Sequence, residues 1–266
     1  MQIQTAAPPQ FRTFGSRFGE AMIRGFVWGI IGIIFGFLFV VLSAYFRAVD
    51  PLSPGFLLTT AAAGALGALI YGSMRLAIIV AVTVNTLAIL YLLLGGDSMP
   101  LEWVALCSCF IGSMMGGIYG RLVKDSRVFR AEAKIIAGMV AGTMASLCLA
   151  LTVMIVGEIS LFWTTMFLCP LTGLIYVSIV PGFVRRCCHL LPPVADGALV
   201  GGGVGVILSV FFWIMVGSLH GNLPPVEQSF IQQTLILLPD GLGGAVLGAS
   251  TLGFLRTVAG AKWLDI

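Results

Sequence analysis

Asp240 is the residue whose type and position in this sequence best suit it to bind an ion, a proton or a substrate. It follows Pro239 inside an apolar stretch, 229–256, that is longer than a bilayer requires at about 1.5 Å per helical residue. A carboxylate within a membrane is costly and is by default a functional candidate, for example for binding an ion, a proton or a substrate. Asp240 lies near the outer end of this stretch, however, where it could instead cap the start of the final helix. The sequence leaves both roles open.

Two prolines and one amide complete the set of candidate site residues. Pro239 and Pro170 stand inside predicted membrane spans, where proline kinks or interrupts a helix. Broken helices at corresponding places in repeated units are a pointer to transport sites. Asn85 is an amide well inside a span, where a hydrogen bond to a neighbouring helix is the simpler role and a place in a transport path is the alternative.

Other chemistry finds no support in the sequence. No H-E-x-x-H, C-x-x-C, P-loop, dinucleotide-binding or nucleophile-elbow motif is present. Three of the six cysteines lie in apolar runs, and the Cys187-Cys188-His189 group follows two arginines at a predicted membrane edge, where reversible acylation is an alternative to a plain interfacial role. We therefore expect no enzymatic activity, no cofactor, no metal and no nucleic-acid partner.

The elements that position these residues are membrane helices. The chain has 266 residues, of which 59% are hydrophobic and 9% charged, whereas soluble domains carry about 25% charged residues. Its surface therefore needs lipid as the solvent. Apolar runs of roughly 20 residues predict an all-α protein with eight spans, at 25–46, 55–74, 76–94, 101–123, 133–157, 159–183, 195–218 and 229–256.

Charge placement supports this count. With a cytoplasmic N-terminus, all the lysines and arginines except Arg47 fall on the cytoplasmic side, as the positive-inside rule predicts. We expect cytoplasmic tails at 1–24 and 258–266 around a membrane domain at 25–257, in a plasma membrane of the bacterial inner-membrane type. The charged and phenylalanine-containing tail 1–24 has the character of a surface segment, part of it an amphipathic helix.

Glycine recurs inside the spans rather than in loops. Small residues at every fourth position usually allow two helix backbones to pack closely, and they can also line a narrow path. The glycines predicted to pack helices are Gly25, Gly29, Gly32, Gly36, Gly64, Gly67, Gly72, Gly112, Gly116, Gly120, Gly138, Gly142, Gly201, Gly205, Gly244 and Gly248.

The spans also repeat in pairs. Segment 63–75 is followed by similar segments at 111–121, 171–185 and 241–256, each of which ends on arginine. Segment 137–142 aligns with 197–202 at a spacing of sixty residues. The pattern predicts four helical hairpins as parallel repeats at 25–75, 76–130, 131–190 and 191–257, because an even number of spans in each unit preserves orientation.

Two functional hypotheses follow. The first is an accessory or scaffold subunit of a larger membrane complex, which packs through its small-residue faces against other membrane subunits or against itself within the lipid bilayer. The second is a transporter or channel for a small solute or ion that uses the proline-containing helices and Asp240. Transporters of charged substrates usually carry more than one intramembrane charge, which argues against the second hypothesis unless the substrate is lipid-like or small and neutral.

Overall fold

The computed structural model describes residues 14–71, 73–93, 101–122, 130–186, 191–220 and 225–259, and every regular element within them is a helix. The prediction of an all-α protein is confirmed for these residues. The helices are α1 (Phe14–Phe46), α2 (Pro54–Tyr71), α3 (Met74–Leu93), α4 (Leu101–Leu122), α5 (Ala131–Val156), α6 (Leu161–Arg186), α7 (Pro193–His220) and α8 (Pro225–Val258).

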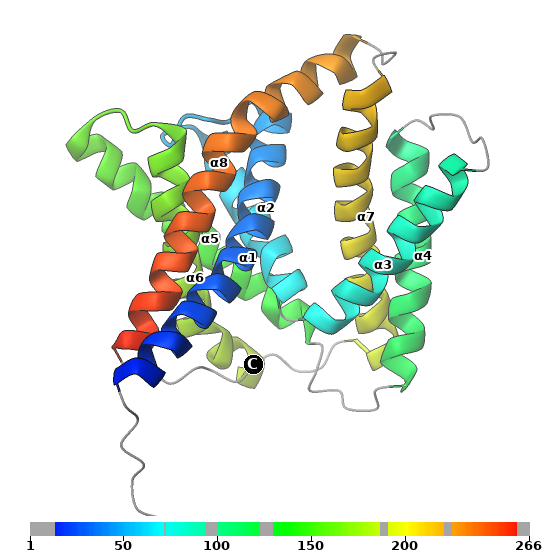
Figure 1. Cartoon of the computed structure of the whole chain (residues 1–266), viewed down its shortest axis with the longest axis horizontal. Coiled ribbons are helices and arrows are strands. Elements are labelled where there is room, and N and C mark those ends of the chain that lie inside the picture. Colours follow the sequence, from blue (N-terminus) through cyan, green and yellow to red (C-terminus); the bar gives the residue numbers. More distant parts are fainter. Residues whose placement is uncertain are drawn as a thin grey trace, which may run out of the picture.

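Seven of the described helices are long and apolar enough to cross a bilayer, and α3 contributes a shorter apolar segment, Arg75–Tyr91. The chain is therefore a multi-pass membrane protein. In Figure 1, α2 ends and α4 begins at opposite ends of the bundle, and α3 runs obliquely between those two ends. The shorter helix thus joins the two ends of the bundle, although it is less clearly a span than the other seven.

Local signals explain where several helices begin and end. The Ser53 hydroxyl accepts a hydrogen bond from the Phe56 N–H at 3.2 Å, so Ser53 caps α2 and Pro54 takes the first helical position, where proline is favoured. Gly157 ends α5 with φ at 94°, a backbone conformation that residues with side chains rarely adopt. Its N–H donates to the Val153 carbonyl, which makes the tight turn into α6.

Helix α1 begins earlier than the sequence suggests. It runs from Phe14 as one helix, so the described part of the tail 1–24 continues the first span instead of forming a separate surface helix. The Phe18 ring packs edge-on against Phe254 of α8, with ring centroids 5.8 Å apart. This contact shows that the first turns of α1 belong to the packed bundle.

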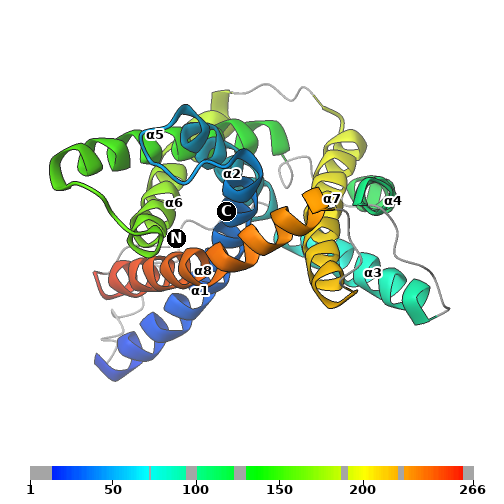
Figure 2. The same ribbon diagram turned by 90° about the horizontal axis from the view of Figure 1, so that it is seen from above.

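The helices with the most extensive contacts are not neighbours in the sequence. α4 lies along α7, α1 along α8, and α2 along α5. Helices α1, α2, α5, α6 and α8 form a five-helix group, and α3, α4 and α7 form a three-helix group beside it (Figure 2). Close packing thus joins helices from different predicted hairpins, and the arrangement as four repeated hairpins stays a prediction.

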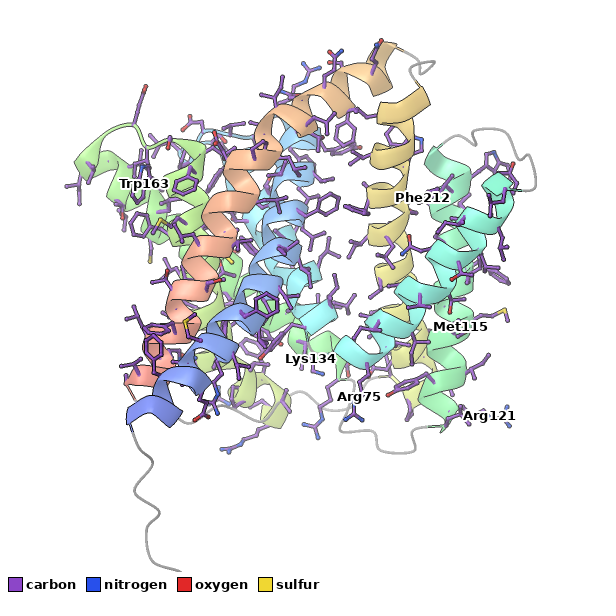
Figure 3. All side chains as sticks on the ribbon, viewed as in Figure 1. Arg75, Met115, Arg121, Lys134, Trp163 and Phe212 are labelled. Carbon is purple, nitrogen blue, oxygen red and sulfur yellow. The ribbon has the colours of Figure 1, made fainter. Side chains whose placement is uncertain are left out.

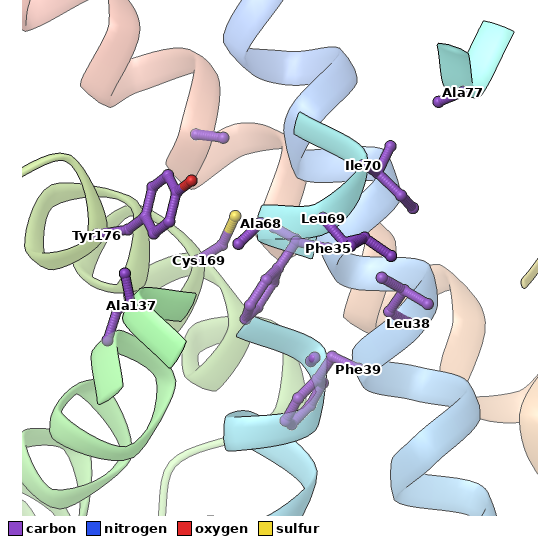
Figure 4. Close-up of a cluster of buried hydrophobic side chains, with 14 of the residues drawn as sticks. Phe35, Leu38, Phe39, Ala68, Leu69, Ile70, Ala77, Ala137, Cys169 and Tyr176 are labelled. Atoms are coloured by element: carbon purple, nitrogen blue, oxygen red, sulfur yellow. The ribbon is translucent and has the colours of Figure 1, made fainter. Parts of the chain in front are cut away.

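The main core combines small residues with a few large rings. Ala63, Ala137 and Ala245 are fully buried, and Phe35 and Phe39 of α1 pack beside them (Figure 4). A second apolar cluster, built on Trp213, Ile214 and Ile231, joins α7 to α8 and α1, because Phe37 of α1 also packs against it. The two helix groups are therefore connected through apolar contacts at this cluster.

Candidate functional site

The structure does not bring the predicted site residues together. Asp240 is exposed on α8, and Asn85 lies on α3 in the other helix group. The Asn85 side-chain amide donates to the Ala81 carbonyl of its own helix at 2.8 Å, so the hydrogen bond described for it lies within α3 and not between helices. A role for these residues in transport stays a prediction.

Asp240 does not cap a helix. Helix α8 is continuous from Pro225 to Val258 and contains both Pro239 and Asp240, so no helix begins there. Pro170 likewise lies inside the continuous helix α6. Neither proline interrupts its helix, since each removes one N–H while the flanking turns continue the helix, and the alternative of a kink at these prolines stays a prediction. Each of α6 and α8 is therefore one long helix and not two shorter helices.

The glycines of α4 and α7 face one another across the α4·α7 interface. A Cβ added to Gly112 would overlap the Gly201 carbonyl oxygen, and one added to Gly116 would overlap the Gly197 carbonyl. The reverse is true as well, because a Cβ at Gly197 or Gly201 would overlap the carbonyls of α4. The two backbones are therefore in direct contact, as small-residue stripes in membrane helices predict.

The α2·α5 interface repeats this arrangement. Gly64 and Gly138 each approach the other's carbonyl oxygen so closely that neither position has room for a Cβ. Gly142 approaches the Thr60 carbonyl in the same way. The glycine faces of α2, α4, α5 and α7 are thus used within this chain, which leaves them unavailable to a partner subunit.

The remaining predicted glycines pack mainly against α8 or α6. On α1, Gly32 approaches the Ala245 backbone of α8. On α8, Gly244 and Gly248 approach the carbonyls of Phe162 and Met166 of α6. Gly25, Gly29 and Gly36 of α1 also lie against α8, and Gly120 of α4 lies against Pro193 at the start of α7. Gly72 lies outside the described residues.

An apolar cleft lies between α1, α2, α5 and α6. It contains about 670 Å³ of space that no atom fills, part of which is open to the surroundings. No charged side chain lines it. The lining residues are Trp28, Ile31, Ile34, Phe35, Gly64, Gly67, Ala68, Tyr71, Gly138, Cys169, Thr172, Gly173, Tyr176 and Val177.

Two hydroxyl groups in the wall of the cleft lack hydrogen-bond partners. Thr172 and Tyr176 are 5% and 6% exposed, and their oxygen atoms are shielded and form no hydrogen bond. Both come from α6, one helical turn apart, so they lie on the same side of that helix. Figure 4 shows the Tyr176 ring extending from α6 on the same side as the Cys169 sulfur and Ala68 of α2.

A cluster of charged side chains lies where α5 and α7 begin. Asp196 of α7 is 5% exposed and accepts a hydrogen bond from the Ala131 N–H at 3.0 Å, so it satisfies a donor in the first turn of α5. Lys134 is equally buried and lies close enough to Asp196 for their charges to attract. The Arg130 guanidinium donates to the Val184 carbonyl of α6. This cluster joins α5 to both α6 and α7.

Most of the described basic residues lie toward the same end of the bundle as this cluster. Arg75, Arg121 and Lys134 lie together near that end in Figure 3, and the last turns of α6 and α8 also carry arginine. Helix α1 begins and α8 ends there as well (Figure 1).

Sequence reasoning missed the polar residues that the structure singles out. The four-residue spacing of Thr172 and Tyr176 could have indicated that they share one face of an apolar helix. The position of Asp196, three residues after Pro193 and just before an apolar run, could have indicated a role at the start of a helix. Among the described residues, no group of three His, Cys, Asp or Glu side chains has the geometry to hold a metal. Cys187, Cys188 and His189 lie outside those residues.

The arrangement in the cleft suits reversible binding of an uncharged molecule. It provides apolar walls for a hydrocarbon body and two hydroxyls for a single polar group. Comparison with protein-family models, with curated proteins and with solved structures finds no match to this chain.

Proposed function

We propose that this chain is a membrane transporter for a small, uncharged and largely apolar molecule, and that the cleft between α1, α2, α5 and α6 is its binding site. One observation carries the proposal: the cleft is apolar, free of charged side chains, and includes two buried hydroxyls without partners. Asp240 does not line this cleft, so the proposal does not depend on it.

The proposal also includes an orientation. We place the end of the bundle that carries Arg75, Arg121 and Lys134 on the cytoplasmic side of a plasma membrane of the bacterial inner-membrane type. The positive-inside rule supports this choice, because most of the described basic residues, Arg47 excepted, lie toward that end. Both chain termini then face the cytoplasm, and α3 counts as the eighth crossing.

Transport is tested with a variant that fills the cleft. Gly67 lines the cleft, and a Cβ placed on it would meet its nearest neighbour, the Phe35 ring, at an ordinary 3.9 Å, so Gly67→Leu adds bulk without displacing backbone. Gly182→Leu is the matched control, because Gly182 is exposed on α6 and has no neighbour within 4 Å.

The assay follows entry of labelled neutral esters, ketones and alcohols of graded chain length into vesicles that contain the purified full chain. The wild type and Gly182→Leu should accelerate entry of at least one of these solutes over protein-free vesicles, and Gly67→Leu should not. Equal entry into all vesicles, with or without protein, would refute transport of such molecules.

A second function is favoured by the outer face of α4. Only 22% of the apolar stretch of α4 is buried within the chain, the lowest share among the seven candidate spans. Its large apolar residues are exposed along one face, opposite its glycines: Trp103, Leu106, Phe110, Met114, Ile118 and Leu122. A partner subunit could cover this face, as expected for a component of a membrane complex. A defined heteromeric band in native electrophoresis after mild-detergent extraction would support that role.

A further inference from the structure

We infer that the cleft recognises a molecule with an apolar chain and one hydrogen-bond-accepting oxygen, such as the carbonyl of an ester or ketone. In this assignment the hydroxyls of Thr172 and Tyr176 donate to that oxygen. The inference rests on the proposed function in one respect, since both require the cleft to hold a molecule.

Thr172 differs from many of the described serine and threonine hydroxyls in this protein, because it makes no hydrogen bond within its own helix. In membrane helices, a serine or threonine usually donates to a carbonyl three or four residues earlier in its own helix. Thr143, Thr165 and Ser178 do so here, with donor–acceptor distances of 2.9, 3.1 and 2.8 Å. Thr172 lies in the same helix as two of these residues and makes no such bond. Its donor is therefore free for another acceptor.

Tyr176 places a second donor in the same wall. Its ring packs edge-on against Tyr71 of α2, with centroids 6.3 Å apart, and this contact fixes the ring at the boundary between α2 and α6. The hydroxyl at the end of the ring has no partner although it is shielded. Ser43 and Thr59 also carry shielded hydroxyls without partners, but neither lines the cleft. Thr172 and Tyr176 are therefore the pair that a molecule in the cleft would meet.

The chemistry of the lining selects the kind of ligand. A buried hydroxyl without a partner costs about 1–3 kcal/mol, and a ligand oxygen that accepts from it removes that cost. A carboxylate or an ammonium group would need a counter-charge, and no charged residue lines the cleft. The walls instead offer aliphatic and aromatic surface, which a hydrocarbon chain can cover.

The experiment compares two brominated probes of similar chain length. Methyl 12-bromododecanoate carries an ester carbonyl, whereas 1-bromododecane carries no oxygen, and bromine quenches the fluorescence of a tryptophan that it contacts. Trp28 lines the cleft and is 6% exposed, so a probe in the cleft reaches it. The full chain is placed in lipid nanodiscs with Trp103, Trp163, Trp213 and Trp263 replaced by phenylalanine, and quenching is measured against probe content in the bilayer.

We expect the ester to bind about three- to tenfold more tightly than the bromoalkane, the effect of one or two net hydrogen bonds. In the double variant Thr172→Val/Tyr176→Phe this preference should vanish, with the affinity for the bromoalkane unchanged. Tyr176→Phe alone removes only an oxygen atom and should lower the preference in part, which keeps the test usable if the double variant unfolds.

The outcomes separate this inference from the proposed function. If both probes quench Trp28 equally and Gly67→Leu abolishes this quenching, the cleft binds molecules but its hydroxyls do not recognise the ester. An ester preference that survives in the double variant would lead to the same conclusion. Absence of Trp28 quenching by either probe would overturn the binding site and the inference together.

Discussion

The α4·α7 interface and the α2·α5 interface are built from the same small residues, but among the described residues the apolar cleft lies beside the second. In both interfaces, glycines bring two helix backbones into direct contact, as Gly116 does with Gly197 and Gly64 with Gly138. The α4·α7 contact extends over several turns, from Gly120 near one end to Gly205 near the other. The α2·α5 contact is bordered by α1 and α6, and the cleft opens there.

Large rings explain the difference. Trp28 and Phe35 of α1 and Tyr176 of α6 stand next to glycines that have no side chain to fill the space between them. Gly67, for example, faces the Phe35 ring, which a Cβ on Gly67 would meet at 3.9 Å, whereas Gly173 lies close against the Trp28 ring, which a Cβ would meet at 3.1 Å. Rings keep α1 and α6 at a distance while glycines draw α2 and α5 together, so the packing cannot close. In this chain, small residues alone give a close interface, and small residues beside large rings leave a cleft.

The largest expected effect is on the α4·α7 interface. Gly116→Leu would force α4 away from α7, because even a Cβ overlaps the Gly197 carbonyl. We expect a loss of about 3 kcal/mol or more in the free energy of unfolding, at or above the upper end of overpacking costs. Thermal unfolding of the purified variant measures this. A change below about 1 kcal/mol, the range of a tolerated swap, would show that α4 and α7 are not in backbone contact.

A smaller effect is expected where the two interfaces meet. Asp196 of α7 accepts from the Ala131 N–H at the start of α5, so Asp196→Ala leaves that donor unpaired. The expected cost is about 1–2 kcal/mol, as for other helix caps. Asp196→Asn keeps an acceptor oxygen and should retain most of the stability. Equal losses in the two variants would mean that the charge of Asp196, and not its hydrogen bond, stabilises this junction.

Much of the fold was predictable because lipid imposes simple rules. Runs of apolar residues located a helix at each predicted span, since every backbone polar group in a bilayer must be satisfied within a helix. The spacing of glycines also indicated which helix faces are small. Which faces meet was not predictable, because all of these faces look alike in sequence. Gly138, for example, packs against Gly64 of α2, whereas Gly197 packs against Gly116 of α4.

The site escaped prediction for a related reason. Asp240 and Pro239 stood out because they are unusual in a membrane, yet they lie inside a continuous helix and Asp240 is exposed. Thr172 and Tyr176 are ordinary in a membrane helix, and their importance depends on partners that only the packing reveals. Their four-residue spacing places the two hydroxyls on one face of a helix, but whether a hydroxyl is unpaired depends on its neighbours in three dimensions.

The central claim is that the cleft holds a molecule and the α4·α7 interface does not. Native mass spectrometry of the full chain, released from nanodiscs made with its native membrane, tests this most directly. The wild type and Gly182→Leu should retain a bound neutral molecule, and Gly67→Leu should lose it with a change in unfolding free energy below about 1 kcal/mol, since the added side chain enters empty space. A wild type that carries no bound molecule, or Gly67→Leu that retains it at the same level, would contradict the account.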